Sequence, residues 1–148
     1  MLHFLVQDIH CCLKLCHMEK ILPLMLLEPI PGNPVYFAGL MNFKNKCIPV
    51  IDLRLAIGLI REQEYPLNIP LLLCSYNHYQ RALIVDNVIG LEEIEEQQIE
   101  MHDEFIKDSS PFCGAITLEA GVSLLLNTAW VFALKLTEKA YQHATNHE

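Results

Sequence analysis

Short apolar runs separated by turn-forming residues recur along the chain, and this pattern constrains the fold more than any other feature. Two apolar runs joined by a few polar residues are typical of a β-hairpin. Prolines cluster between residues 29 and 34, where they exclude a strand because proline lacks a backbone donor. The sequence therefore predicts a loop at 29–34, a separate strand at 21–27, and four hairpins, which cover residues 2–15, 37–51, 70–88 and 112–126.

Helical signals are short and lie beside these runs. Asp52 is placed to cap a helical turn over residues 53–57, which Gly58 would end. Residues 128–141 have apolar side chains at helical spacing, which predicts a C-terminal helix of about three to four turns. In the second hairpin the tip is 44–46, and Asn45 is the residue expected to take a positive φ. This pattern is typical of a mainly β, barrel-type protein and not of a doubly wound parallel sheet.

Composition excludes several classes of partner. The chain has 148 residues, which fits one domain. Its net charge of −8 disfavours nucleic acid and anionic membrane surfaces, which both bind clustered Lys and Arg. No apolar stretch reaches the roughly 20 residues of a membrane span. We therefore expect a cytoplasmic protein with no direct membrane insertion and no nucleic acid among its partners.

A cluster of histidines and cysteines offers the main alternative function, a metal-binding or hydrolytic protein. The cluster consists of His10, Cys11, Cys12, Cys16 and His17. On a strand Cys11 and Cys12 point to opposite faces, and the chain has no C-x-x-C pair. This arrangement favours a half-buried strand, so we expect no metal and no disulfide.

An acidic segment and the absence of catalytic motifs also argue against a metal site and against an enzyme. The segment contains Glu92, Glu93, Glu95, Glu96, Glu100, His102, Asp103 and Glu104. Its spacing lacks the glycine turn of a calcium loop, so a solvated acidic segment is the favoured interpretation. The sequence also lacks G-x-S-x-G, a P-loop and G-x-G-x-x-G. We therefore expect no cofactor and no enzymatic activity.

The residues from 39 to 53 read Gly-Leu-Met-Asn-Phe-Lys-Asn-Lys-Cys-Ile-Pro-Val-Ile-Asp-Leu. They resemble the signature of CheW-like domains, roughly G-x-x-N-L-R-G-x-x-x-P-V-I-D-L. Further matches follow in the family's order: Asn33-Pro34 upstream, the run from Ala82 to Val88, and the stretch Leu124 to Asn127 before a last helix. The resemblance covers nearly the whole chain.

This resemblance implies two intertwined five-stranded SH3-like barrels within a single domain over residues 1–148. It also implies a non-enzymatic chemosensory adaptor, which binds receptor cytoplasmic hairpin tips and the regulatory domain of a CheA-type histidine kinase. A specialised version in a pilus or twitching system is one form that it could take. A degenerate domain that only oligomerises is a further alternative.

The resemblance implies partner-binding roles for Met18, Lys20, Gly39, Asn42 and Lys44. Lys44 stands where the family usually has Arg, and it keeps the charge but loses the planar fork of donors. We therefore expect Lys44 to contact a partner more weakly than Arg would. For Met18, an ordinary core position is the competing interpretation.

Overall fold

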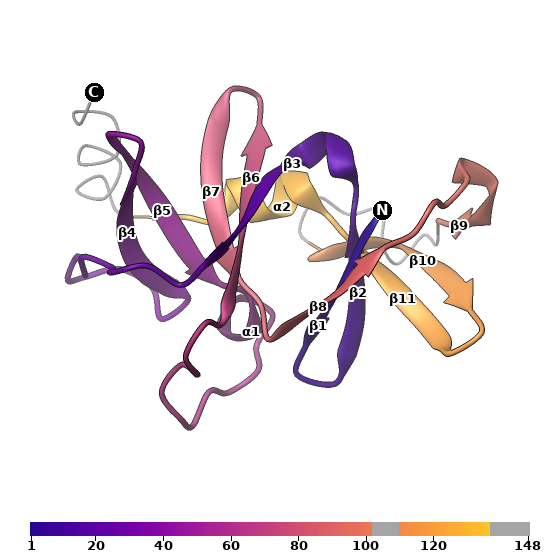
Figure 1. Cartoon of the computed structure of the whole chain (residues 1–148), viewed down its shortest axis with the longest axis horizontal. Coiled ribbons are helices and arrows are strands. Elements are labelled where there is room, and N and C mark those ends of the chain that lie inside the picture. Colours follow the sequence, from indigo (N-terminus) through magenta and orange to yellow (C-terminus); the bar gives the residue numbers. More distant parts are fainter. Residues whose placement is uncertain (102–109, 137–148) are drawn as a thin grey trace.

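The computed structural model describes residues 1–101 and 110–136, which form two β-sheets joined by short helices (Figure 1). The predicted mainly β fold is confirmed. Each sheet mixes antiparallel hairpins with one parallel pair of strands, β2 with β11 in one sheet and β5 with β7 in the other.

The first sheet has six strands in the order β8-β1-β2-β11-β10-β9. These strands are β1 (Leu2–Val6), β2 (Ile9–Leu13), β8 (Asn87–Leu91), β9 (Ile99–Glu100), β10 (Phe112–Leu118) and β11 (Gly121–Leu126). The second sheet has five strands in the order β3-β6-β7-β5-β4. These are β3 (Met18–Pro23), β4 (Phe37–Phe43), β5 (Lys46–Asp52), β6 (Pro70–Tyr76) and β7 (Tyr79–Ile84).

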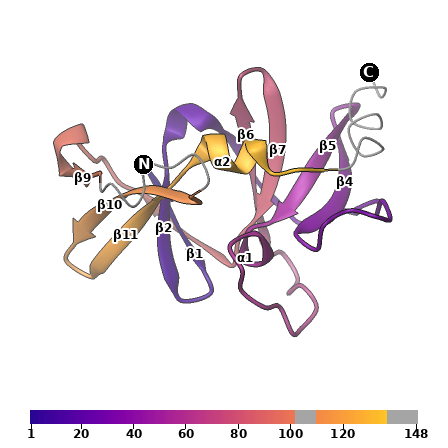
Figure 2. The ribbon, with the colours of Figure 1, turned by 180° about the vertical axis from the view of Figure 1, so that it is seen from behind.

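The path of the chain intertwines the two sheets. The six-stranded sheet takes its strands from both ends of the chain, whereas the five-stranded sheet takes all of its strands from the middle. The two views in Figures 1 and 2 show the sheets side by side, with α2 crossing from the six-stranded sheet to the five-stranded one. The short helices are η1 (Leu15–His17), α1 (Leu53–Ala56), η2 (Glu96–Gln98) and α2 (Thr128–Ala133). No helix in the described ranges combines the length and the apolar character that a membrane crossing requires.

The barrels implied by the resemblance are open and unequal. The sheets have six and five strands, and within the described residues neither hydrogen-bonded order returns to its first strand. In the five-stranded sheet, an isolated bridge between Glu28 and Leu40 joins the segment after β3 to β4. Its two backbone hydrogen bonds, of 2.8 and 2.9 Å, bring the two edges of that sheet toward each other.

The predicted hairpins are present. The backbone angles of two of their turns account for the residues found there. Lys44 and Asn45 both have positive φ, 51° and 64°, and so do Asn77 and His78 in the β6–β7 turn. Two consecutive positive φ values are typical of the two-residue turn whose twist matches that of the flanking strands. The tip is therefore two residues long, and Lys46 already belongs to β5. The positive φ expected for Asn45 is confirmed.

Three predicted boundaries are wrong. The strand expected at 21–27 lies at Met18–Pro23, because β3 pairs with β6 from Met18 onward. The run at 82–88 is split between the two sheets, since β7 ends at Ile84 and β8 begins at Asn87. The C-terminal helix ends at Ala133, because Leu134 leaves the helical region with ψ 127°. The rest of the expected helix, 137–141, lies outside the described residues, as do His102, Asp103 and Glu104 of the acidic segment.

An apolar seam between the sheets forms the main core. Phe4 and Leu13 from the six-stranded sheet pack in the same buried cluster as Ile51, Leu72 and Leu83 from the five-stranded one. All five side chains are fully buried. Because each sheet contributes to one shared core, the seam holds the two sheets together through the hydrophobic effect.

Candidate functional site

Two of the predicted partner-binding residues, Lys20 and Lys44, meet at the ring of Phe43. The Nζ atom of Lys20 lies 5.8 Å from the ring centroid, and that of Lys44 lies 5.4 Å from it. Lys20 comes from β3 and Phe43 from β4, which are opposite edges of the five-stranded sheet. Asn42 and Lys46 are exposed beside them. We call these five residues the aromatic tip.

The aromatic tip concentrates positive charge on an acidic chain. Lys20 and Lys44 share the ring of Phe43, and Lys46 is the β5 partner of Phe43, whereas the chain as a whole has a net charge of −8. A cation within about 6 Å of an aromatic ring is attracted by the negative face of the ring, by roughly 0.5–1 kcal/mol at exposed sites. The lysines are thereby held near one ring, and the tip offers both an apolar surface and positive charge to an acidic partner.

Met18 and Gly39 lie elsewhere and have structural roles. Met18 is half-buried at the start of β3 and packs against the main core. Gly39 is buried with a φ of 143°, and a Cβ atom there would lie 2.9 Å from the carbonyl oxygen of Glu28. Glycine at 39 therefore permits the close approach of the Glu28 backbone to β4. The partner contacts expected of both residues stay predictions.

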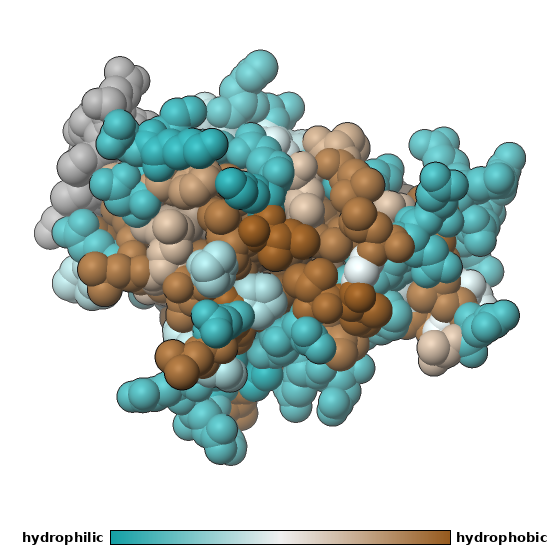
Figure 3. Space-filling model, in the orientation of Figure 1, coloured by the Kyte–Doolittle hydropathy of each residue, from teal (hydrophilic) through white to brown (hydrophobic). Residues whose placement is uncertain are grey.

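An apolar surface lies between the two sheets on the face shown in Figure 3. Apolar side chains gather along the middle of this face, over the region where β3 and β8 lie in Figure 1. These strands carry the exposed side chains of Ile21, Ile89 and Leu91, which are 42%, 51% and 68% accessible. β3 and β8 are edge strands of the two different sheets, and a cluster of exposed apolar side chains is typical of protein–protein contact surfaces.

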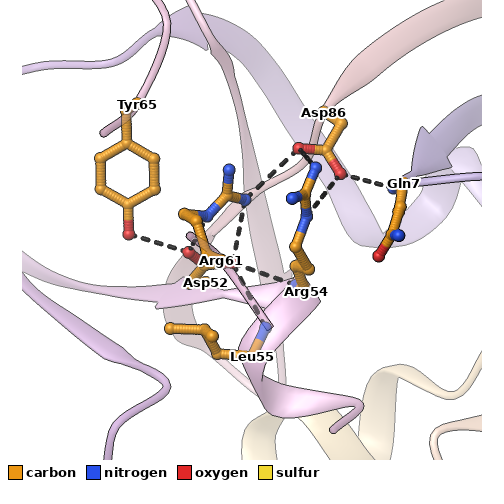
Figure 4. Close-up of polar contacts among 7 residues, drawn as sticks. All are labelled: Gln7, Asp52, Arg54, Leu55, Arg61, Tyr65 and Asp86. Carbon is orange, nitrogen blue, oxygen red and sulfur yellow. Dashed lines mark hydrogen bonds and ion pairs between the residues drawn. The ribbon is translucent and has the colours of Figure 1, made fainter. Parts of the chain in front are cut away.

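A buried carboxylate organises the region beyond β5 (Figure 4). Asp52, with no exposed surface, caps α1 by accepting hydrogen bonds from the backbone amides of Arg54 and Leu55. Its other donors are Arg61, whose Nε lies 2.7 Å away, and the hydroxyl of Tyr65 at 2.8 Å. Burial alone would lower the pKa of Arg61, but the hydrogen bond and charge of Asp52 raise it. Burial, followed by the charge of Asp52, raises the pKa of Tyr65.

A second carboxylate, Asp86, connects this network to the other sheet. Arg54 pairs with it at 2.7 Å and Arg61 at 3.4 Å. Asp86 also accepts a hydrogen bond from the backbone amide of Gln7, in the β1–β2 turn of the six-stranded sheet. A hollow of about 560 Å³ opens beside the network and is lined by Gln7, Arg54, Gly58, Leu59, Ile60, Arg61, Glu62, Gln63, Glu64, Pro66 and Asp86.

The histidine and cysteine cluster does not converge on one point. His10 contacts His3, with 3.2 Å between Nε2 of His10 and Nδ1 of His3, whereas His17 contacts the hydroxyl of Thr128 at 3.0 Å. Cys11 and Cys12 are buried, and Cys16 is exposed. In the part of the chain that the structure describes, no three His, Cys, Asp or Glu side chains are placed to hold a metal ion. Strand geometry explains the separation, because neighbouring residues point to opposite faces.

Sequence reasoning missed the partners of the residues that it identified. Asp52 has a local signal because a cap acts on the turn that follows it. Arg61 and Asp86 have no such signal, since Arg61 lies nine residues from Asp52, beyond α1, and Asp86 lies 32 residues from Arg54. The proximity of Phe43 to Lys44 was visible in the sequence, but the arrival of Lys20 from the opposite edge of the sheet was not.

Comparisons with known proteins agree with this architecture. The family model described as a CheW-like domain matches residues 1–135. Among solved structures, the crystal structure of the scaffolding protein TtCheW from Thermoanaerobacter tengcongensis superposes with a TM-score of 0.80 at 20% sequence identity. The match covers 92% of this chain and 97% of that one, so the two share a fold. No curated protein sequence matches the chain significantly.

Proposed function

The chain belongs to the CheW-like domain family, and we propose that it is a non-enzymatic adaptor of chemosensory signalling. The proposed adaptor couples the cytoplasmic hairpin tips of chemoreceptors to the regulatory domain of a CheA-type histidine kinase. It acts as one domain in the cytoplasm, at receptor arrays on the inner face of the membrane. A pilus or twitching system is a specialised setting for the same role.

The observation that carries the proposal is the aromatic tip. Lys20 and Lys44 reach one ring from opposite edges of the sheet, on a rigid hairpin whose turn residues are solvent-exposed. No catalytic reaction is needed for scaffolding. A rigid domain that holds receptor and kinase together converts their encounter into a local one and raises their effective concentration. The solved relative is itself named a scaffolding protein, which supports this role.

A binding experiment tests the proposal directly. The purified chain is used to capture a receptor hairpin-tip fragment and, separately, the regulatory domain of a CheA-type kinase. We expect both to be retained, and retained together in a ternary complex. Failure to retain either one at low salt contradicts the adaptor role.

Variants at Lys44 test whether the aromatic tip is the contact. Lys44→Ala should weaken binding to one partner by less than about 1 kcal/mol, the usual scale of an exposed ion pair. The effect should fade at high salt because mobile ions screen exposed charges. Lys44→Arg should strengthen binding, since a guanidinium can pair with a carboxylate through two parallel hydrogen bonds.

Calorimetry against each partner measures both effects. Lys14→Ala provides the matched control, because Lys14 is an exposed lysine outside the tip. If neither Lys44 variant alters binding while the partners still bind, the contact lies elsewhere and Lys44 is a surface charge only.

A further inference from the structure

We propose that residues 127–136 form a clasp that opens and closes across the two sheets, and that Arg81 of β7 holds it closed. The clasp consists of Asn127, α2 and residues 134–136. Figure 2 shows it crossing from β11 in the six-stranded sheet toward the five-stranded sheet. The inference concerns the fold itself and does not depend on the proposed adaptor role.

The clasp is a third link between the sheets, and it differs in kind from the other two. Residues 14–17 lead from β2 to β3, and residues 85 and 86 lead from β7 to β8, so both of these links are covalent at each end. The clasp continues β11, but within the described residues no strand follows it, and side chains hold it against the five-stranded sheet. Contacts of this kind can break while both sheets stay folded.

Arg81 makes the central polar contact between the clasp and the five-stranded sheet. Its Nη1 atom donates hydrogen bonds of 2.9 Å to the carbonyl oxygens of both Val131 and Leu134. Its guanidinium carbon also lies 5.9 Å from the ring centroid of Phe132. Arg81 is buried, and a hydrogen bond to a charged group is stronger than one between neutral groups. Arg81 is therefore placed to act as the latch of the clasp.

Further contacts complete the closed clasp. The hydroxyl of Tyr36 donates a hydrogen bond of 2.6 Å to the carbonyl oxygen of Lys135. The side chains of Val131 and Leu136 are buried in the main core between the sheets. Opening the clasp therefore withdraws two apolar side chains from the seam and leaves the strand pairings of both sheets intact. The arrangement of the two sheets becomes adjustable in this way.

The helix within the clasp contributes little to keeping it closed. α2 has six residues, whereas an isolated helix needs roughly 12–15 residues to be even marginally stable in water. Its first turn depends on the cap from Asn127 and on the contact of Thr128 with His17 at 3.0 Å. A segment held by a few tertiary contacts opens at a lower free energy than a packed sheet unfolds. We therefore expect the clasp to open before either sheet does.

Trp130 reports on the clasp directly, because it is the only tryptophan of the chain and lies in α2, packed against the main core. We expect urea to shift its fluorescence at a lower concentration than it changes the far-UV circular dichroism of the sheets. A protein without a separate opening step gives the same midpoint for every probe. Coincident fluorescence and circular-dichroism transitions therefore overturn the proposal.

Variants at the anchors test whether Arg81 is the latch. Arg81→Met keeps an apolar stem in place of the guanidinium, and it should raise the population of the open clasp about tenfold, the scale of one hydrogen bond to a charged group. Hydrogen exchange followed by mass spectrometry measures this as faster exchange of the α2 amides relative to those of β7. Tyr36→Phe removes a contact nearer the surface and should give the same selective change by a smaller factor, so the test stands even if Arg81→Met folds poorly.

Arg61→Met is the matched control, since it removes a nearly buried arginine that contacts Asp52 and Asp86 in another part of the fold. It should lower the circular-dichroism midpoint and leave the ratio of α2 to β7 exchange rates unaltered. If Arg61→Met speeds α2 as selectively as the clasp variants do, the change reflects a general loss of stability and the proposal fails. It fails equally if neither Arg81→Met nor Tyr36→Phe raises that ratio.

Discussion

At the scale of the residue, Asp52 combines two tasks that are usually separate. Its carboxylate caps α1 through the amides of Arg54 and Leu55, and it also neutralises Arg61 inside the protein. A cap removed from a helix costs about 1 kcal/mol, but removing one partner of a buried ion pair leaves an uncompensated charge, which costs about 3–5 kcal/mol.

Asp52→Ala should therefore lower the free energy of unfolding by more than a lost cap does, up to about 3 kcal/mol, since Arg61 loses its nearest carboxylate and keeps only Asp86 at 3.4 Å. Urea unfolding followed by circular dichroism measures the loss. Asn127→Ala is the matched control, because Asn127 caps α2 through the amide of Trp130 and carries no charge. If both variants lose about 1 kcal/mol, Asp52 acts as an ordinary cap.

The Asp52 network also shows how far sequence reasoning reaches. The cap was predicted because Asp52 directly precedes the turn that it stabilises. Tyr65 and Arg61 could not be assigned to it, since their approach depends on the path of the loop after Gly58. The same holds for Lys20, which reaches Phe43 only because the five-stranded sheet curves enough to bring its two edges together.

At the scale of the element, β4 depends on the close approach of the backbone at Glu28. Gly39 has a φ of 143°, and a side chain there would collide with the backbone of Glu28. The sequence match marked this glycine as a partner-binding residue, whereas the structure gives it a role in holding Glu28 against Leu40. The motif alone does not distinguish the two roles, because both require the same small residue.

Gly39→Ala should lower the thermal midpoint more than Gly58→Ala does. Both glycines have positive φ, but a Cβ at 58 meets nothing within 4 Å, whereas at 39 it lies 2.9 Å from the oxygen of Glu28. The difference between the two variants therefore isolates the collision from the backbone strain. Equal midpoints would show that β4 yields easily and that the packing against Glu28 does not require glycine at 39.

The C-terminal helix is the element whose end the local sequence pattern predicted least well. The helical stripe extended to 141, yet α2 ends at Ala133. Arg81 of β7 donates hydrogen bonds to the carbonyl oxygens of Val131 and Leu134, each at 2.9 Å. A buried guanidinium thus satisfies carbonyls that a continuing helix would have bonded to its own amides. Periodicity cannot show this competition, because Arg81 lies far away in the sequence.

At the scale of the whole molecule, the buried His3 and the half-buried His17 tie segments of the chain together. His3 of β1 contacts His10 of β2 and Ser123 of β11, and Glu92 after β8 lies 3.8 Å from its ring. Burial, followed by the charge of His10, lowers the pKa of His3, although Glu92 opposes this. Burial also lowers the pKa of His17, with a further contribution from Lys14.

The lowered pKa values predict a loss of stability in mild acid. The unfolded chain binds protons at these histidines near the ordinary pKa of about 6.5, before the folded chain does. The free energy of unfolding should therefore be highest above that pH and decrease as the pH falls through it. Thermal midpoints at pH 7.5 and pH 5.5 measure the change. His3→Gln should reduce the pH dependence, whereas His78→Asn, at an exposed turn position, should leave it unaltered. Equal pH dependence in the wild-type chain and His3→Gln would exclude His3 as the cause.

The parallel pairing of β2 with β11 affects the order in which the protein folds during synthesis on the ribosome. The strands of the five-stranded sheet all lie between residues 18 and 84, so they leave the exit tunnel early and together. The β1–β2 hairpin leaves before them, but Cys11 and Cys12 reach their places beside Leu124 and Leu125 only after the whole five-stranded sheet has been made and β11 has emerged. Pairings between distant parts of a chain form late, since a long loop must close before they contribute. Because the chain is made from its N-terminal side, β2 appears before the five-stranded sheet but completes its pairing after it, and the apolar edge of β2 stays open to other nascent chains until β11 arrives.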